Sequence, residues 1–333
     1  MLRQPYLLFL GDAPDLLAAK VAKGIRDWRP DAAVGQLRLP GCKPDMGLPD
    51  MTVAEAADAG AKTLVVGVAN RGGVISRQWI AVLKEALAAG MDLAAGLHNH
   101  LHDEPELVEA AQKAGRQLFD VRVPQHDYPI ADGSRRSGRR CLTVGTDCSV
   151  GKMYASMAIE REMHERGLNA TFRATGQTGI LITGGGVPLD AVVADFMAGA
   201  VEWLTPDNDA DHWDIIEGQG SLFHPSYSGV TLALIHGGQP DALVLCHEPE
   251  RPHMRGLPHY TLPGLTDVLS LAERCAHIVN PAARTVGVAL NTSALDERAA
   301  RAWIERAREE TGLPATDPIR YGAGPLVDAL ESL

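Results

Sequence analysis

The sequence has little that would suit a nucleic acid, a membrane or an oxidising compartment. Among its 333 residues, 31 basic side chains are outnumbered by 42 acidic ones, which gives a formal net charge of −11. Nucleic acids and anionic membranes bind basic surfaces, so we expect neither as a partner. The five cysteines include no CxxC pair, which indicates a reduced, cytoplasmic chain.

Long hydrophobic runs are also missing. The first apolar run, residues 6–10, ends at Gly11, which is too short for a signal sequence or a membrane span and predicts a strand. Aromatic residues make up only 5% of the chain, but 45% of the residues are hydrophobic, as in a globular protein. A chain of this length favours two domains of ordinary size.

Strand and helix patterns alternate along the chain, which predicts parallel sheets with right-handed crossovers. The fold class is therefore α/β, with an N-terminal Rossmann-like parallel-sheet domain and a C-terminal P-loop NTPase-like α/β domain. We place the first domain at residues 1–123, an interdomain linker at 124–138 and the second domain at 139–333. The glycine-rich residues 177–186 are expected to form a loop, and residues 318–333 a tail.

The linker assignment rests on its polar composition with prolines and glycines. Four arginines lie in or just after it: Arg135, Arg136, Arg139 and Arg140. They form either a solvated basic run or the mouth of an anion site.

A phosphate-binding loop follows the linker. An apolar, β-branched lead-in predicts a buried strand, and a helical pattern follows the glycine-bounded loop and its lysine. Backbone N–H groups of such a loop face an anion, and the lysine adds a point charge. The expected cofactor-binding residues are Gly145, Thr146, Cys148, Ser149, Val150, Gly151, Lys152, Met153 and Tyr154.

Two features of this loop depart from the usual P-loop. Five residues separate Gly145 from Gly151, where the usual motif has four. Met153 stands where a Ser or Thr hydroxyl normally holds Mg²⁺. Phosphate binding is therefore predicted, while metal-assisted nucleotide hydrolysis is not, and no metal is expected.

The loop and a downstream Glu-Gly-Gln-Gly motif at residues 217–220 resemble the dethiobiotin synthetase branch of P-loop proteins. A closer resemblance covers essentially the whole chain and rests on residues 145–153, 173–179 and 216–222. It is to a bacterial family that includes a D-glutamate N-acetyltransferase of D-amino-acid catabolism. Methionine after the lysine is usual there, so the resemblance implies that the loop holds the phosphates of acetyl-CoA.

Amine acetylation needs a base, because the attacking amine must be neutral. Glu217, which ends a predicted strand beside the P-loop, and Asp147 are the catalytic candidates; the alternative for Glu217 is hydrogen bonding to loop amides or Lys152. Cys148 is either a nucleophile activated by the helix N-terminus or an ordinary small loop residue. Gln177 is a further expected cofactor contact.

The substrate implied by the resemblance, D-glutamate, needs cationic partners for its carboxylates. Arg71 and Arg173, one from each predicted domain, are the candidates, with a surface position as the alternative for Arg71. The run His98-Asn99-His100-x-His102 is compatible with a metal site, a solvated loop or substrate contact, and we assign His98 and His100 to the substrate.

Two other functional classes stay open at this stage. One is an ATP-dependent ligase or kinase of the dethiobiotin synthetase type, and the other is a nucleotide-binding regulatory protein without turnover. A homo-oligomer is expected.

Overall fold

The computed structural model describes residues 2–16, 18–68 and 75–333. The chain divides into two compact units. The first unit comprises Met1–Gln125 together with Gly176–Ala191, and the second comprises His126–Thr175 together with Val192–Leu333. The chain therefore passes between the units three times.

The first unit is built on a five-stranded parallel sheet with the strand order β2-β1-β3-β4-β5. Its strands are short and largely buried, as expected for apolar runs covered on both faces: β1 (Tyr6–Gly11), β2 (Ala33–Arg38), β3 (Thr63–Val66), β4 (Asp92–Ala95) and β5 (Leu118–Asp120).

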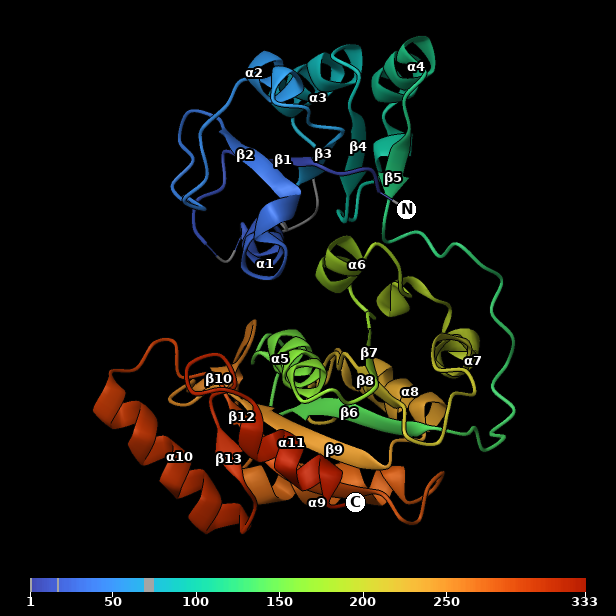
Figure 1. Ribbon diagram of the computed structural model, residues 1–333, viewed down its shortest axis with the longest axis vertical. Helices are drawn as coiled ribbons and strands as arrows, with labels where there is room; N and C mark the ends of the chain where they lie inside the picture. Colours follow the sequence, from blue (N-terminus) through green and yellow to red (C-terminus); the bar gives the residue numbers. More distant parts are fainter. Residues whose placement is uncertain (1, 17, 69–74) are drawn as a thin grey trace. The chain divides into compact units, whose positions relative to one another are not determined.

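Helices cover both faces of this sheet (Figure 1). On one face lie α1 (Lys20–Trp28) and α6 (Gln177–Thr183), which contact each other. On the other face lie α2 (Val53–Asp58), α3 (Arg77–Ala88) and α4 (Pro105–Ala114). Capping residues fix two of the helix starts, because the side chains of Thr52 and Ser76 accept hydrogen bonds from the first turns of α2 and α3.

The second unit contains a six-stranded parallel sheet with the order β13-β12-β9-β6-β8-β7. Its strands are β6 (Arg139–Gly145), β7 (Ala170–Arg173), β8 (Trp213–Ile216), β9 (Ala242–His247), β12 (Arg284–Leu290) and β13 (Ala315–Thr316). A separate antiparallel hairpin is formed by β10 (His253–Met254) and β11 (Leu257–Thr261).

Two layers of helices enclose this second sheet (Figure 1). One layer consists of α5 (Lys152–Glu165) and α11 (Gly324–Glu331). The other consists of α7 (Ala194–Leu204), α8 (Ser228–Gly238), α9 (Leu265–Ala276) and α10 (Glu297–Thr311). The α/β class, the Rossmann-like first half and the P-loop second half are as predicted.

Two predicted irregular segments are helical instead. Residues 177–183 form α6, because Ile180, Leu181 and Ile182 are buried in the first unit and outweigh the glycines around them. Within the predicted tail, α11 forms because Leu326, Val327 and Leu330 are buried in the second unit, where α11 contacts β12, β13 and α5.

The arginines of the predicted linker differ in their surroundings: Arg135 is exposed and pairs with Asp241, whereas Arg136 and Arg140 are largely buried and bind main-chain carbonyl oxygens. Arg136 donates to the carbonyl oxygens of Thr205 (2.7 Å) and Gly237 (2.6 Å), at the C-terminal ends of α7 and α8. Arg140 is 0% exposed and donates to the carbonyl oxygens of Ser137 (3.2 Å) and Arg136 (3.0 Å). A guanidinium at a helix C-terminus complements the helix dipole, so Arg136 stabilises two helix ends at once.

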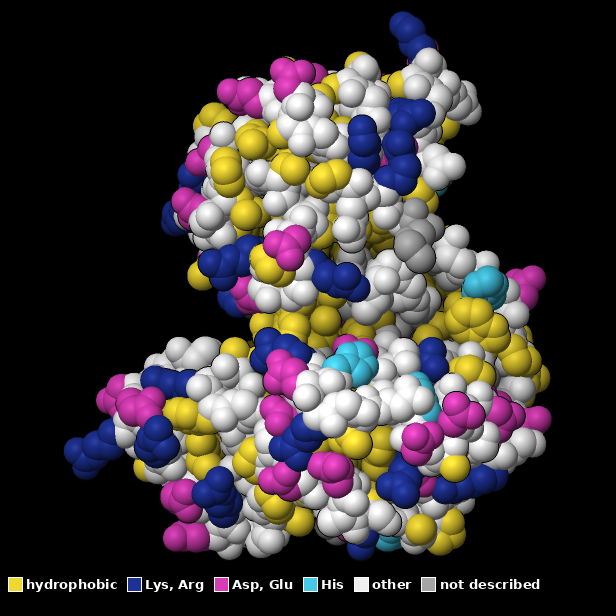
Figure 2. Space-filling model, viewed as in Figure 1, with side chains coloured by type: hydrophobic (Ala, Val, Ile, Leu, Met, Phe, Trp, Pro, Cys, Tyr) yellow, Lys and Arg dark blue, Asp and Glu magenta, His cyan; other side chains and the backbone are white. Residues whose placement is uncertain are grey.

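The face shown in Figure 2 has basic and acidic side chains interspersed, with no single basic patch. Across the described residues, no helix has the length and apolar character needed to span a bilayer.

Candidate active site at the P-loop

Three strands of the second sheet end side by side at the P-loop. In the register, Gly145 of β6 pairs with Cys246 of β9, and Leu142 pairs with Ile216 of β8. His247 and Glu217, the next residues of β9 and of the chain after β8, therefore emerge beside the loop. The carboxyl edge of a parallel sheet is where ligands collect.

The loop adopts a conformation that presents a helix end to a ligand. Ser149 and Gly151 have positive φ angles of 55° and 102°, and Gly151 is the N-cap of α5. The first N–H groups of α5 have no acceptor within the helix, and the helix dipole adds partial positive charge there. The loop can therefore hold an anion such as phosphate.

Lys152, the first residue of α5, is only 5% exposed. Its Nζ donates to the carbonyl oxygens of Asp147 (2.8 Å) and Gly220 (2.8 Å). Burial lowers the pKa of this ammonium, and nearby negative groups, Asp147 among them, only oppose that effect, while its direct partners are neutral carbonyls. An anionic ligand would supply a full negative charge.

The Gly-Gln-Gly motif lies close to the lysine because its glycines permit tight approach. A Cβ on Gly218 would lie 1.7 Å from the carbonyl oxygen of Thr143. Gly220 has a φ of 64°, and a Cβ there would lie 2.2 Å from the carbonyl oxygen of Tyr227. Any other residue would displace this segment from β6 and from Lys152.

Asp147 is 0% exposed, and both of its carboxylate oxygens accept hydrogen bonds. One oxygen accepts from the Cys148 backbone N–H (2.6 Å). The other accepts from the Arg251 side chain (2.7 Å) and from the Arg255 backbone N–H (2.8 Å). The carboxylate therefore ties the β10–β11 hairpin and the segment before it to the P-loop.

Arg251 also binds the loop directly. Its guanidinium donates to the carbonyl oxygens of Cys148 (2.6 Å) and Ser149 (3.0 Å) and pairs with the carboxylate of Glu248. These contacts hold two of the loop carbonyl oxygens in place.

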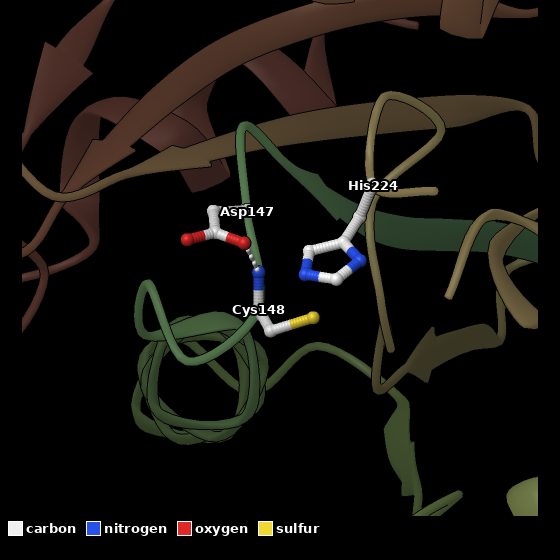
Figure 3. A group of neighbouring side chains, drawn as sticks. All are labelled: Asp147, Cys148 and His224. Carbon is white, nitrogen blue, oxygen red and sulfur yellow. Dashed lines mark hydrogen bonds between the residues drawn. The ribbon is translucent and has the colours of Figure 1, made fainter. Parts of the chain in front are cut away.

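Asp147, Cys148 and His224 bring potential metal ligand atoms within 4.8 Å of one another (Figure 3). His224 Nδ1 accepts from the Ser226 backbone N–H (3.2 Å), so its Nε2 donates to the Arg255 carbonyl (3.3 Å). No imidazole lone pair is then available, and the nearby lysine and arginines repel a cation. This group fits a hydrogen-bonded cluster better than a metal centre.

Burial raises the pKa of the Cys148 thiol, and the nearby positive charges of Lys152, Arg255 and Arg251 only oppose that effect. A thiol with a raised pKa is mostly protonated at neutral pH and is a poor nucleophile. The geometry therefore favours the ordinary loop cysteine over the covalent alternative.

Glu217 lies directly after β8 and is largely buried. Its Oε2 accepts from the Thr175 backbone N–H (2.9 Å), and its carbonyl accepts from the Thr175 hydroxyl (2.7 Å). Gln219 donates to the same threonine through its side-chain amide. The loop after β7 and the loop after β8 are thus fastened together at the edge of the P-loop.

His247 is the buried residue at the end of β9. Its Nδ1 shares a hydrogen bond of 3.0 Å with the Thr146 hydroxyl, and its ring lies against Trp303. Burial, reinforced by the charges of Arg251 and Arg306, lowers the pKa of His247 to about 4. The imidazole is therefore neutral at physiological pH and does not compete with Lys152 for a counter-charge.

The predicted substrate residues lie in different surroundings. Arg173 ends β7, and its Nε donates to the buried carboxylate of Asp214 (2.6 Å). His98 is exposed after β4 in the first unit, where the charge of Arg122, with partial burial, lowers its pKa. Arg71 lies outside the described residues.

The other predicted residues of this group also lie in the first unit. His100 is 3.6 Å from the carboxylate of Asp103, and His102 pairs with Asp120 (2.6 Å). Their partners are therefore acidic, and in the part of the chain that the structure describes these histidines belong to no cluster with metal-ligand spacing. Gln177 opens α6 and packs against Gly96.

The sequence alone assigned no role to several residues of this site. Arg251, Arg255 and His224 meet Asp147 and Cys148 only because the segment after β9 and the loop after β8 fold back over the P-loop. The one available signal was the position of these segments after strands that end at the same sheet edge.

Comparison with known proteins identifies the family. A model described as a domain of unknown function (DUF1611_C), P-loop domain, matches residues 129–327. A second, described as a domain of unknown function (DUF1611_N), Rossmann-like domain, matches residues 38–124.

Related proteins match from end to end. A D-glutamate N-acetyltransferase of Tritonibacter scottomollicae is 64% identical over 333 residues, which is 100% of both chains. A protein of the same name from a Pseudoalteromonas species is 47% identical over 326 residues, which is 98% of both chains. These matches confirm the resemblance noted in the sequence.

A crystal structure of a DUF1611 family protein from Anabaena variabilis superposes with a TM-score of 0.89. The two sequences are 36% identical, and the match covers 99% of this chain and 100% of the other. With a P-loop match over more than half of its length and relatives that span it entirely, the chain belongs to the DUF1611 family.

Proposed function

We propose that the chain transfers the acetyl group of acetyl-CoA to the amine of D-glutamate, giving N-acetyl-D-glutamate and free coenzyme A. The observation that carries the proposal is the full-length identity of 64% and 47% to two proteins named D-glutamate N-acetyltransferase. The P-loop geometry supports it independently, because it fits a phosphate-bearing donor.

Coenzyme A suits this loop in two respects. Its diphosphate matches the N–H groups at the start of α5 and the buried Lys152, whose ammonium donates to two main-chain carbonyl oxygens. Met153 offers no hydroxyl for Mg²⁺, so the loop suits a phosphate that is held rather than one that is transferred.

The chemistry requires the neutral amine of D-glutamate to attack the thioester carbonyl carbon. The C–N bond forms, the C–S bond breaks, the attacking amine loses one proton, and the coenzyme A thiolate takes up a proton to leave as the free thiol. We propose Glu217 as the base that takes the amine proton, directly or through water, while backbone N–H groups stabilise the oxyanion.

Asp147 enters the proposal as a positioning residue. Both of its oxygens already accept hydrogen bonds, so it is suited to hold the loop and Arg251 in place rather than to remove a proton. Asp147 would then fix the geometry of the loop, and Glu217 would take the proton from the amine.

D-glutamate also needs cations for its two carboxylates. We propose Arg71 and Arg173 as these cations. The charge of Arg173 is paired with Asp214, so Arg173 would have to share its guanidinium between Asp214 and the substrate. Substrate contacts of His98 and His100, and a donor contact of Gln177, also remain proposals. We further propose a cytoplasmic homo-oligomer, in line with cysteines that are all free.

Release of free thiol from acetyl-CoA tests the reaction. We expect release with D-glutamate and little with L-glutamate or other amines. Thiol release without any amine would identify a hydrolase. No thiol release, combined with phosphate release from ATP, would indicate a ligase or kinase. ATP binding without any turnover would indicate a nucleotide-binding regulatory protein.

Glu217→Gln tests the base. The variant keeps an oxygen that can accept from Thr175, so the fold should persist while kcat falls by about 100-fold or more. Glu305→Gln, at an exposed position on α10, is the matched control and should retain wild-type turnover. Unchanged kcat in Glu217→Gln across the pH range would remove Glu217 from the mechanism while leaving the donor assignment intact.

A further inference from the structure

In the part of the chain that the structure describes, the cationic side chains of Lys152, Arg251 and Arg255 lie at the P-loop, and the first two already have an assigned role. Lys152 is enclosed by two carbonyl oxygens at the start of α5, where a diphosphate would bind. Arg251 is paired with the carboxylates of Asp147 and Glu248. The third cation, Arg255, differs from both.

Arg255 stands at the turn of the β10–β11 hairpin, and its main chain is fixed on both sides of the residue. Its N–H donates to Asp147 Oδ2 (2.8 Å), and its carbonyl accepts from His224 Nε2 (3.3 Å). Its guanidinium, by contrast, has no hydrogen bond or ion pair with any residue that the structure describes.

The charge of Arg255 nevertheless acts on the loop. Burial raises the pKa of the Cys148 thiol, and Arg255 is one of the cations that counteract this rise. Arg255 is only partly exposed, so its charge is not freely screened by solvent. An uncommitted guanidinium held by its main chain at an anion site is suited to bind a further anion.

We propose that Arg255 binds the ribose 3′-phosphate of coenzyme A and thereby selects the 3′-phosphorylated donor; this inference rests on the proposed function. The helix N-terminus and Lys152 can account for the diphosphate. The 3′-phosphate is a separate monoester with a charge of about −1.5 to −2, and it needs its own cation. A guanidinium can form two parallel hydrogen bonds with such a group.

Calorimetric titration with coenzyme A and with 3′-dephospho-coenzyme A, which differ only in that phosphate, tests the assignment. Wild-type protein should bind coenzyme A about 10- to 100-fold more tightly, as expected for one charge-assisted contact. Arg255→Ala should lose this preference because its affinity for coenzyme A falls while its affinity for 3′-dephospho-coenzyme A stays unchanged. Arg255→Lys should retain part of the preference. The matched control is Arg298→Ala, an exposed arginine on α10, which should bind both compounds as wild type does.

The outcomes separate this inference from the proposed function. Equal wild-type affinity for both compounds, no binding of either, or an Arg255→Ala variant that weakens both equally would overturn the inference. Thiol release from acetyl-CoA with D-glutamate would stand as evidence for the reaction even then. Wild-type selectivity that Arg255→Ala abolishes, in a protein that releases no thiol, would uphold the phosphate contact and reject the acetyl transfer.

Discussion

In each unit the first strand is followed by a turn that leads into a helix. The two turns have similar places in the topology, but their residues differ in what they can bind. In the second unit, β6 leads through the P-loop into α5, whose N-terminal N–H groups are available to a ligand. In the first unit, β1 ends at Gly11, and the chain turns toward α1. The strand order places β1 between β2 and β3, where a parallel sheet of this kind has its crevice.

Among the described residues, a tryptophan side chain packs against the turn after β1. A Cβ on Gly11 would lie 2.6 Å from the ring of Trp79, whose Nε1 donates to Asp12 (3.0 Å). The N–H of Ala22 near the start of α1 donates to the Gly67 carbonyl (3.0 Å). An indole and a backbone carbonyl thus occupy the space and the donor that a phosphate would use.

Strand order therefore provides a crevice, but side chains decide whether it binds a ligand. Glycine occurs at both turns, and its role is opposite in the two. Gly11 admits a tryptophan ring, whereas Gly151 opens a helix with its N–H groups free of intrahelical partners. The experiments below test this difference, in order of expected effect.

Trp79→Ala should have the largest effect, and it should lower the stability of the protein without changing its affinity for coenzyme A. Trp79 is buried and stacks edge-on against Phe9, so we expect a loss of about 3–5 kcal/mol in the unfolding free energy of the first unit. Urea unfolding followed by circular dichroism measures this loss. Trp203→Ala, at a position nearly half exposed in the second unit, is the matched control and should cost less.

Calorimetric affinity for coenzyme A should not change in Trp79→Ala. A changed affinity would mean that the turn after β1 contributes to the ligand site, and the contrast between the two turns would fail.

Lys152→Ala should weaken coenzyme A binding by about 2–3 kcal/mol, because a buried charge-assisted contact is lost. The measurement is calorimetric titration of coenzyme A, with thermal unfolding to confirm that the variant is folded. Lys84→Ala, which removes a lysine from a partly exposed ion pair with Glu106, is the control and should bind normally. Undiminished affinity in Lys152→Ala would place the phosphates elsewhere.

His247 should make the second unit sensitive to acid. Its pKa is lowered to about 4 in the folded protein from 6.5, so the unfolded chain binds more protons between these values and stability rises with pH. The contribution is complete above about pH 6.5 and is lost as the pH falls toward 4. Between pH 7 and pH 5 the unfolding free energy should therefore fall by about 1.5–2 kcal/mol because of His247.

Urea unfolding at pH 7 and pH 5 measures the effect as a difference between variants. His247→Gln should show a smaller loss on acidification than wild type, while His259→Gln, at an exposed hairpin position, should behave as wild type. Equal losses in wild type and His247→Gln would show that the imidazole is not held neutral by burial.

Much of the fold could be predicted because buried strands and amphipathic helices leave strong local patterns. Helix α4 is an example, since a proline begins it and Gly115 ends it in the left-handed conformation. The short strands of the β10–β11 hairpin and β13 were missed, because two to five residues are too few to establish a period.

The candidate site was predictable only where its residues are consecutive. The P-loop is one run of sequence, so its conformation could be anticipated from glycines and a lysine. The contact between Asp147 and Arg251 joins residues 104 positions apart, and that between Asp147 and Arg255 joins residues 108 apart. Such contacts depend on how the hairpin folds back, and no local pattern encodes that.

The assignment of Gly176–Ala191 to the first unit has a consequence for synthesis on the ribosome. The helix that contacts α1 and packs against Gly96 is encoded after the P-loop, within the gene region of the second unit. A nascent chain released only to residue 125 lacks this helix, and translation of the next stretch, at about 5–20 residues per second, takes seconds. The first unit therefore completes its fold only after the P-loop has emerged, so the usual N-terminus-first order of domain folding is interrupted here.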